Sequence, residues 1–140
     1  LFSECDIISL HVPLNDETRD MINEEVLSHA KPGLVLINAA RGEVVDIEAL
    51  HDAMKSGQIG GAGLDVLAEE PTNLERPLLH AWHNEEEWIR DRLIITPHSA
   101  FYTPQSVYDM RTKGITVALK YLRTGRLENC VNNEFLKNPR

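Results

Sequence analysis

The chain lacks most features that mark secreted, membrane or nucleic-acid-binding proteins. Its 140 residues include only two cysteines, Cys5 and Cys130, whose spacing fits neither a zinc site nor a disulfide framework. No apolar run approaches the roughly 20 residues that cross a bilayer, and no signal peptide is visible. Lys and Arg number 14 against 22 Asp and Glu, which gives a net charge of −8. We therefore expect a cytoplasmic protein with reduced thiols and no nucleic-acid or membrane partner.

The chain also lacks an initiating methionine, because it starts at Leu1 and runs almost at once into an apolar segment. We therefore expect it to be a piece of a longer protein. Its length nevertheless suits a single domain with a sizeable core.

Short apolar runs alternate with amphipathic segments along the sequence. We predict strands at residues 6–10, 34–37, 60–66 and 93–95, and helices at residues 24–30, 47–55 and from Pro104 to just before Gly125. Strands joined through helices predict right-handed crossovers and a parallel sheet, so the expected fold class is α/β. Continuously apolar strands further indicate a sheet that is covered on both faces. Residues 71–92 are too long for a simple turn and are expected to form an insertion, a lid or an edge loop.

Arg41, Glu70 and His98 each follow one of these predicted strands. Parallel strands end at one edge of a sheet, where open α/β folds bind ligands, so we expect the three side chains to converge. The guanidinium of Arg41 suits a carboxylate and an adjacent carbonyl oxygen. His98 could give a proton to that oxygen, while Glu70 fixes the imidazole tautomer and favours its charged form. Asp65, directly at a strand end, could hydrogen-bond the amide of a nicotinamide or another polar ring, so the set indicates a carbonyl-reducing site.

Other interpretations of these residues are plainer. Taken singly, an arginine after a strand is usually a surface ion-pair partner, and Glu-Glu-Pro is usually a loop. His80, His83 and Glu87 share one segment but have no fixed scaffold and no cysteine ligands, so we expect no metal. A hydrolase that uses Asp65, His98 and a serine is disfavoured because the sequence lacks a G-x-S-x-G elbow.

Four motifs in this order resemble the NAD-dependent D-isomer-specific 2-hydroxyacid dehydrogenases. They are His11-Val12-Pro13-Leu14, Ile37-Asn38-Ala39-Ala40-Arg41-Gly42, Gly63-Leu64-Asp65-Val66 with Glu69-Glu70-Pro71, and Thr96-Pro97-His98-Ser99-Ala100. The resemblance covers essentially the whole chain. Phe101-Tyr102, Met110-Arg111 and Asn129-Cys130-Val131-Asn132 are most similar to the subgroup of C-terminal binding proteins, which are dehydrogenase-like co-repressors.

The resemblance implies the C-terminal half of a Rossmann-type, doubly wound parallel sheet with a long C-terminal linker helix. Residues 1–124 would form part of an NAD-binding domain, and residues 125–140 a tail that returns to a substrate domain. Arg41 would hold a small 2-oxo or 2-hydroxy acid, His98 would be the acid/base and Glu70 its partner. The longer protein would be a homodimer.

The implied cofactor is NAD, with NADP left open. Val12, Pro13, Leu14 and Thr18 would cover its adenine and phosphate side. The nicotinamide would be lined by Ala39, Ala40, Arg41, Asp65, His98, Ser99, Ala100 and Phe101.

The sequence also departs from the family pattern. It has no G-x-G-x-x-G phosphate loop, because Gly60-Gly61-Ala62-Gly63 precedes a strand end and not a helix, and no ribose-binding acid follows at the expected distance. We therefore expect the isolated chain to bind NAD poorly and to show no turnover. Two alternatives stay open: an NAD-sensing scaffold similar to the co-repressors, or an inactive truncated piece whose first strand invites self-association.

Overall fold

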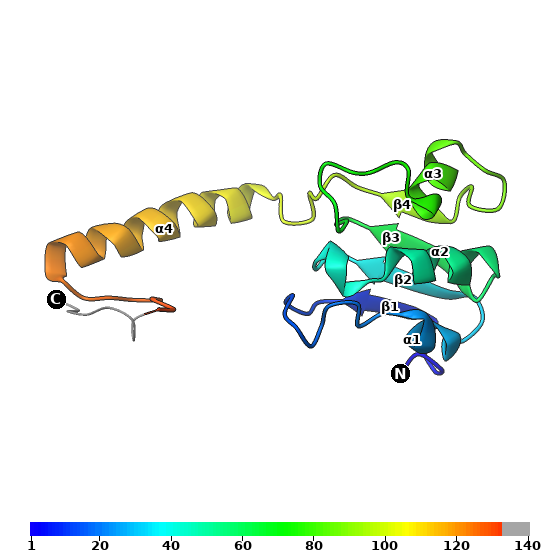
Figure 1. The fold of residues 1–140 in the computed structure, drawn as a ribbon. Helices are drawn as coiled ribbons and strands as arrows, with labels where there is room; N and C mark the ends of the chain where they lie inside the picture. Colours follow the sequence, from blue (N-terminus) through cyan, green and yellow to red (C-terminus); the bar gives the residue numbers. More distant parts are fainter. Residues whose placement is uncertain (133–140) are drawn as a thin grey trace. The chain divides into compact units, whose positions relative to one another are not determined.

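The structure, a computed structural model, describes residues 1–132 and divides the chain into two compact units. Unit 1 is Leu1–Ser99, and unit 2 begins at Ala100. The elements of unit 1 are, in chain order, β1 (Ile7–Leu10), α1 (Glu24–Ser28), β2 (Leu34–Asn38), a 3-10 helix η1 (Gly42–Val44), α2 (Ile47–Lys55), β3 (Ile59–Leu64), α3 (Pro77–His83) and β4 (Leu93–Ile95) (Figure 1).

All four strands of unit 1 are parallel and lie in the order β1-β2-β3-β4. The register places Asn38 opposite both Leu10 and Leu64, and Leu64 opposite Ile95. The four strands therefore end at one level, and the loops that follow them leave from the same edge of the sheet. The α/β class with a parallel sheet, predicted from the sequence, is confirmed.

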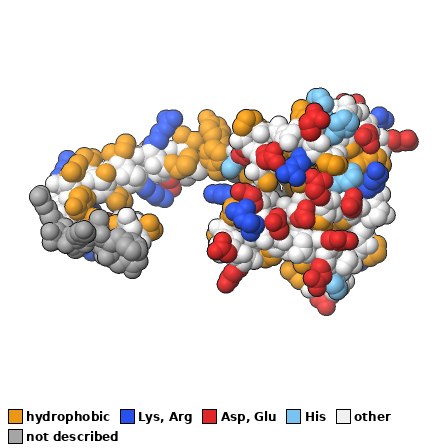
Figure 2. Space-filling view, viewed as in Figure 1, with side chains coloured by type: hydrophobic (Ala, Val, Ile, Leu, Met, Phe, Trp, Pro, Cys, Tyr) orange, Lys and Arg blue, Asp and Glu red, His pale blue; other side chains and the backbone are white. Residues whose placement is uncertain are grey.

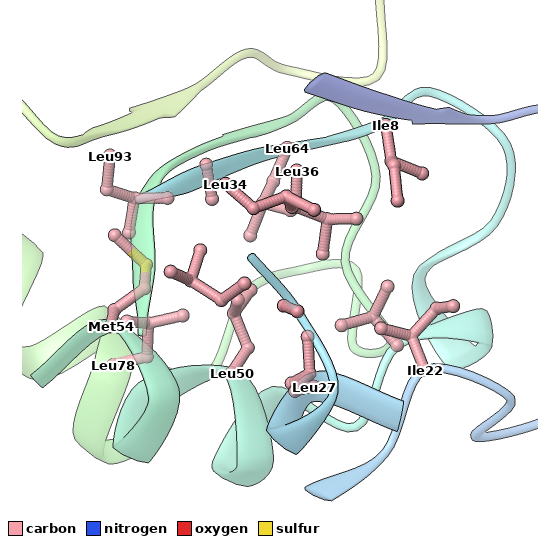
Figure 3. Packing of buried hydrophobic residues seen from close by; sticks show 14 of the residues in the cluster. Ile8, Ile22, Leu27, Leu34, Leu36, Leu50, Met54, Leu64, Leu78 and Leu93 are labelled. Carbon is pink, nitrogen blue, oxygen red and sulfur yellow. The ribbon is translucent and has the colours of Figure 1, made fainter. Parts of the chain in front are cut away.

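One face of the sheet is covered by helices whose inner residues form the core. Helix α2 begins after Asp46, whose side chain accepts hydrogen bonds from the amides of Glu48 and Ala49. It buries Leu50 and Met54 completely, and Figure 3 shows both side chains between the helix and the sheet. Leu27 of α1 is buried in the same cluster. This burial of apolar surface fixes the sheet and the position of its loops.

The opposite face is not covered within unit 1, which differs from the sequence prediction. Ile7 is 62%, Ile37 37% and Ile94 67% exposed, whereas their neighbours Ile8, Leu36 and Leu93 are buried. Successive side chains of a strand point to opposite faces, and the helices of unit 1 bury one of the two sets. An apolar strand sequence indicates that both faces of the strand can be buried, but it does not indicate which element covers each face.

Residues 71–92 pack against the core of unit 1 through α3 and Ile89, which favours the predicted insertion over a lid or an edge loop. They contain α3, in which Leu78 is fully buried. The ring of Trp88 meets His51 of α2 edge-on, with 5.4 Å between the ring centroids. The Arg92 guanidinium closes the segment by donating hydrogen bonds of 2.6–2.8 Å to the carbonyls of Met54, Ile59, Gly60 and Trp88.

Unit 2 contains one long helix, α4 (Pro104–Thr124), as the sequence predicts. Thr103 caps it through a capping box with Ser106, and Gly125 ends it with φ +68° in the left-handed region. None of the α4 residues is buried within this unit. The predicted return of residues 125–140 to a substrate domain stays a prediction, and residues 133–140 lie outside the described part.

Acidic side chains predominate on the face of unit 1 that Figure 2 shows, in keeping with the overall charge of −8. In the part of the chain that the structure describes, no helix has the length and the apolar character needed to cross a membrane.

Candidate active site

Arg41, Asp65 and His98 follow the ends of β2, β3 and β4, which are neighbours in the sheet. Glu70 follows β3 in the same loop as Asp65. Because the strand ends are in register, these loops share the carboxyl edge of the sheet. Open α/β sheets bind their ligands at this edge.

His98 and Glu70 form a direct pair in this region. The Nδ1 of His98 lies 2.8 Å from Oε2 of Glu70, and both side chains are 42% exposed. The other carboxylate oxygen, Oε1, accepts a hydrogen bond of 3.1 Å from the amide of Leu67. His98 itself has φ +50°, in the left-handed region that non-glycine residues rarely adopt. Such backbone conformations concentrate at functional sites.

The pair has a clear electrostatic consequence for Glu70. The hydrogen bond from His98 holds the pKa of the Glu70 carboxyl below its ordinary value of 4.5, with a further contribution from the Leu67 amide. Glu70 is therefore a carboxylate at neutral pH. A carboxylate at Nδ1 fixes a proton on that nitrogen and leaves Nε2 as the atom that can gain or lose one.

The lowered pKa of Glu70 predicts a pH-dependent contribution to stability. The folded chain binds this proton more weakly than the unfolded chain, so the contribution is present above pH 4.5 and is lost as the pH falls through the lowered pKa. We expect Glu70→Gln to be slightly destabilising near neutral pH, with a difference from the wild type that shrinks in acid. Urea unfolding of both chains over this pH range measures it, and a difference that grows toward low pH would contradict the assignment.

Asp65 connects the ends of β3 and β4. The residue is only 9% exposed, and its Oδ1 accepts hydrogen bonds from the Thr96 hydroxyl and, at 2.9 Å, from the Ser99 amide. It thereby fixes the turn that presents His98. Its expected contact with a nicotinamide stays a prediction.

The structure does not place Arg41 in contact with His98. The Arg41 side chain is exposed, and its Nη1 donates to the carbonyl of Ala40 at 2.7 Å. Its turn is held by the buried Asn38, whose amide donates to the Arg41 carbonyl and accepts from the Ala40 amide. These bonds fix the backbone that carries the guanidinium.

Gly42 brings this turn against the loop of Glu70. A Cβ at Gly42 would lie 2.0 Å from the carbonyl carbon of Leu67 and 2.2 Å from the nitrogen of Ala68. Arg41 is therefore adjacent to a residue that packs on the backbone leading to Glu70. This contact links the loop of Arg41 to the loop of Glu70 at the carboxyl edge of the sheet.

The residues expected to contact the adenine and phosphate side lie in the loop after β1, at the same edge. The Thr18 hydroxyl donates to the carbonyl of Pro13 at 2.7 Å and accepts from the Asn15 amide at 2.9 Å, so this loop is closed on itself. Val12 and Leu14 are partly buried against the core. Ala100 and Phe101 belong to unit 2, so their expected place beside the nicotinamide stays a prediction.

A cavity of about 400 Å³ opens against the pair of His98 and Glu70. Its polar lining includes Asp65, Glu70, Thr96 and His98, and its remaining walls are Leu67, Pro71, Thr72, Leu74, Trp82, Ile95 and Pro97. Its volume is within the range of small-molecule sites, which combine apolar walls with a few polar groups.

Sequence reasoning missed the contacts of three residues in or next to the loops of the site. Asn38 and Gly42 lie inside a motif that drew attention, but nothing in the pattern showed what they contact. Arg76 carried no local signal, although it forms ion pairs with Glu48 and Glu69, the residue before Glu70. Contacts between distant loops are not visible in residue spacing.

Among the described residues, no group of three or more His, Cys, Asp or Glu is arranged to hold a metal ion. His80 of α3 is instead bonded to Asn84, and its Nδ1 lies 4.0 Å from Glu86.

Comparison with known proteins relates this geometry to one family. A family profile described as "D-isomer specific 2-hydroxyacid dehydrogenase, NAD binding domain" matches residues 1–100. The chain is 37% identical to a glyoxylate reductase of Korarchaeum cryptofilum over 98% of its own length and 39% of the relative's. It is 34% identical to a D-lactate dehydrogenase of Staphylococcus aureus over 92% and 40%.

Solved structures give the same result. The D-isomer specific 2-hydroxyacid dehydrogenase of Lactobacillus delbrueckii, in its NAD-complexed form, matches with a TM-score of 0.80 and 40% identity. The match covers 94% of this chain and 41% of that one. The chain spans about 40% of the length of these relatives, whose names give no support to the co-repressor subgroup. The chain belongs to the D-isomer specific 2-hydroxyacid dehydrogenases, as part of the NAD-binding domain of that family.

Proposed function

We propose that the protein containing this chain is an oxidoreductase. It transfers hydride between NAD and the second carbon of a small D-2-hydroxy or 2-oxo acid. The observation that carries the proposal is the 2.8 Å contact between Glu70 and His98 at the carboxyl edge of the sheet, beside the cavity. An exposed arginine on the neighbouring loop adds a group that can bind an acid.

His98 is the acid/base of this reaction. Glu70 holds the proton on Nδ1 and stabilises the imidazolium, so Nε2 donates a proton to the carbonyl oxygen during reduction and takes it back during oxidation. Arg41 binds the carboxylate of the substrate through its fork of donors and polarises the adjacent carbonyl.

The residues of this chain fit the nicotinamide end of NAD, which supplies or accepts the hydride when bound. Asp65, Glu70, Thr96 and His98 provide polar groups around a cavity whose other walls are mostly apolar. The phosphate loop of the family is not in this sequence, so the chain offers only part of the contacts of the dinucleotide. We therefore propose that the chain alone binds NAD weakly.

The co-repressor-like alternative is not favoured by any contact in the described residues. A protein that only senses NAD needs no hydrogen-bonded acid/base pair, whereas a reductase does. Homodimer formation and a cytoplasmic location stay predictions for the longer protein.

Activity of the longer protein tests the proposal directly. We expect it to oxidise NADH with glyoxylate or pyruvate, and we expect Arg41→Gln to lower kcat/KM roughly 10- to 100-fold by loss of a charge-assisted hydrogen bond. Arg90→Gln is the matched control, because Arg90 is an exposed arginine that reaches the carbonyl of Glu85. No reduction of any 2-oxo acid, or equal effects of the two variants, would refute the proposal.

A further inference from the structure

We propose that Arg76 is a positioning residue for the acid/base pair, because it holds the loop of Glu70 by bridging Glu69 to Glu48 of α2. The inference deepens the proposed function and takes its catalytic meaning from it. The bridge itself is a property of the chain that can be measured without any assay of activity.

The guanidinium of Arg76 binds both carboxylates at once. Its Nε and Nη2 donate to Oε1 of Glu69 at 3.1 and 2.6 Å, and its Nη1 donates to Oε1 of Glu48 at 3.1 Å. A planar guanidinium can make these bonds together, whereas the single ammonium of a lysine cannot reproduce the fork. The hydrogen bond from Arg76 is also the main cause of the lowered pKa of Glu69.

Two residues of the bridge, Glu48 and Arg76, belong to helix ends that are fixed by the core. Glu48 lies in the first turn of α2, which is capped by Asp46 and anchored by the buried Leu50. Arg76 is the residue before Pro77, the first residue of α3, and its carbonyl accepts from the His80 amide at 2.8 Å. The bridge therefore connects the Glu69 side chain to two helices that are held by burial.

The segment that the bridge closes is otherwise exposed. Residues 68–75 are all exposed, and the contact between Glu69 and Arg76 joins the two ends of this stretch. Glu70 follows Glu69 directly, so a shift of Glu69 moves the carboxylate that contacts His98. A catalytic hydrogen bond is sensitive to such a shift, since a displacement of about 1 Å can lower a rate roughly a hundredfold.

The effect on positioning can be separated from an effect on stability. The Arg76, Glu48 and Glu69 side chains are 41–44% exposed, and ion pairs at this exposure contribute little to folding. If Arg76 had a merely structural role, its replacement would change the stability very little and would leave the pKa of Glu70 unchanged. A positioning role, in contrast, changes the pKa of Glu70.

The first experiment is a carbon-13 NMR titration of the Glu70 carboxyl in the 140-residue chain. We expect Arg76→Gln to raise the pKa of Glu70 toward its ordinary value of 4.5, with a melting temperature close to that of the control Arg90→Gln. We expect Arg76→Lys, which keeps the charge without the fork, to raise this pKa as well. A wild-type titration of Glu70 in Arg76→Gln, or in Arg76→Lys, would overturn the proposal.

The second experiment measures kinetics in the longer protein. We expect Arg76→Gln to lower kcat roughly tenfold while the KM for NADH stays unchanged, because the acid/base pair is displaced and the cofactor contacts are not. Unchanged kcat in an active protein would overturn the positioning role. An inactive wild-type protein would refute the proposed function alone, since the NMR titration decides the bridge independently.

Discussion

Replacing His98 by Asn is expected to lower kcat/KM for 2-oxo acid reduction by about 10²- to 10⁴-fold in the protein that contains this chain. This is the usual contribution of a positioned general acid/base, and His98 is the residue to which we assign that role. Asn is the suitable replacement because, after glycine, it is among the residues that best tolerate the left-handed region, and His98 has φ +50°. The backbone turn after β4 is therefore expected to survive the substitution.

The affinity for NADH provides the control. Most of the contacts expected for the cofactor come from residues other than His98, so His98→Asn should leave the Kd for NADH nearly unchanged. Fluorescence titration of NADH with the wild type and the variant measures it. A parallel loss of NADH affinity and turnover would show that His98 is structural, and full retention of kcat would exclude it as the acid/base.

A second variant tests the partner. Glu70→Gln keeps the size of the side chain and an oxygen that can accept from Nδ1, but it removes the charge that stabilises the imidazolium. A smaller loss of kcat than in His98→Asn is therefore expected.

The sequence was sufficient to predict the bounds of those helices whose signals lie within one short segment of the chain. Helix α2 has the predicted bounds, Ile47–Lys55, because its cap at Asp46 and its buried positions lie within one short segment. Helix α4 also begins at Pro104 and ends before Gly125, as predicted. Predicted boundaries failed by a few residues where no cap marks the end, as in β3, which is Ile59–Leu64 rather than residues 60–66.

The candidate site was predictable only in outline. Glu70 and His98 are 28 residues apart, and their meeting follows from the parallel order of β3 and β4, which was predicted although the helix between these strands was not. The bridge by Arg76 does not follow from any such rule, because it depends on how α3 packs against α2. The helical nature of residues 77–83 was missed for the same reason, since a short helix of seven residues shows little periodicity.

The largest effect on stability is expected for Gly42→Ala. The added Cβ would lie 2.0 Å from the carbonyl carbon of Leu67, and both this atom and the nearby nitrogen of Ala68 belong to the backbone. No side-chain rotation can relieve that overlap, so one of the two loops must move, at a cost of about 3 kcal/mol in the free energy of unfolding. Urea unfolding of the chain measures this difference.

Gly63→Ala is the matched control, because Gly63 lies in β3 and the nearest atom to its added Cβ is Cγ1 of Ile37 at 4.0 Å, an ordinary contact. We expect this variant to change stability much less than Gly42→Ala. Equal destabilisation by the two substitutions would contradict the close approach of the loops.

The same variant tests how Arg41 and Glu70 are connected. Because Gly42 is adjacent to Arg41 and contacts the backbone at residues 67 and 68, a displacement here changes the position of the arginine relative to Glu70. In the longer protein, Gly42→Ala should therefore raise the KM for the 2-oxo acid and lower kcat together, whereas Arg76→Gln should lower kcat alone. Separate effects of this kind would show that the contact of Gly42 sets the distance between Arg41, which binds the substrate, and Glu70. They would also show that the contacts of Arg76 hold Glu70 in place beside His98.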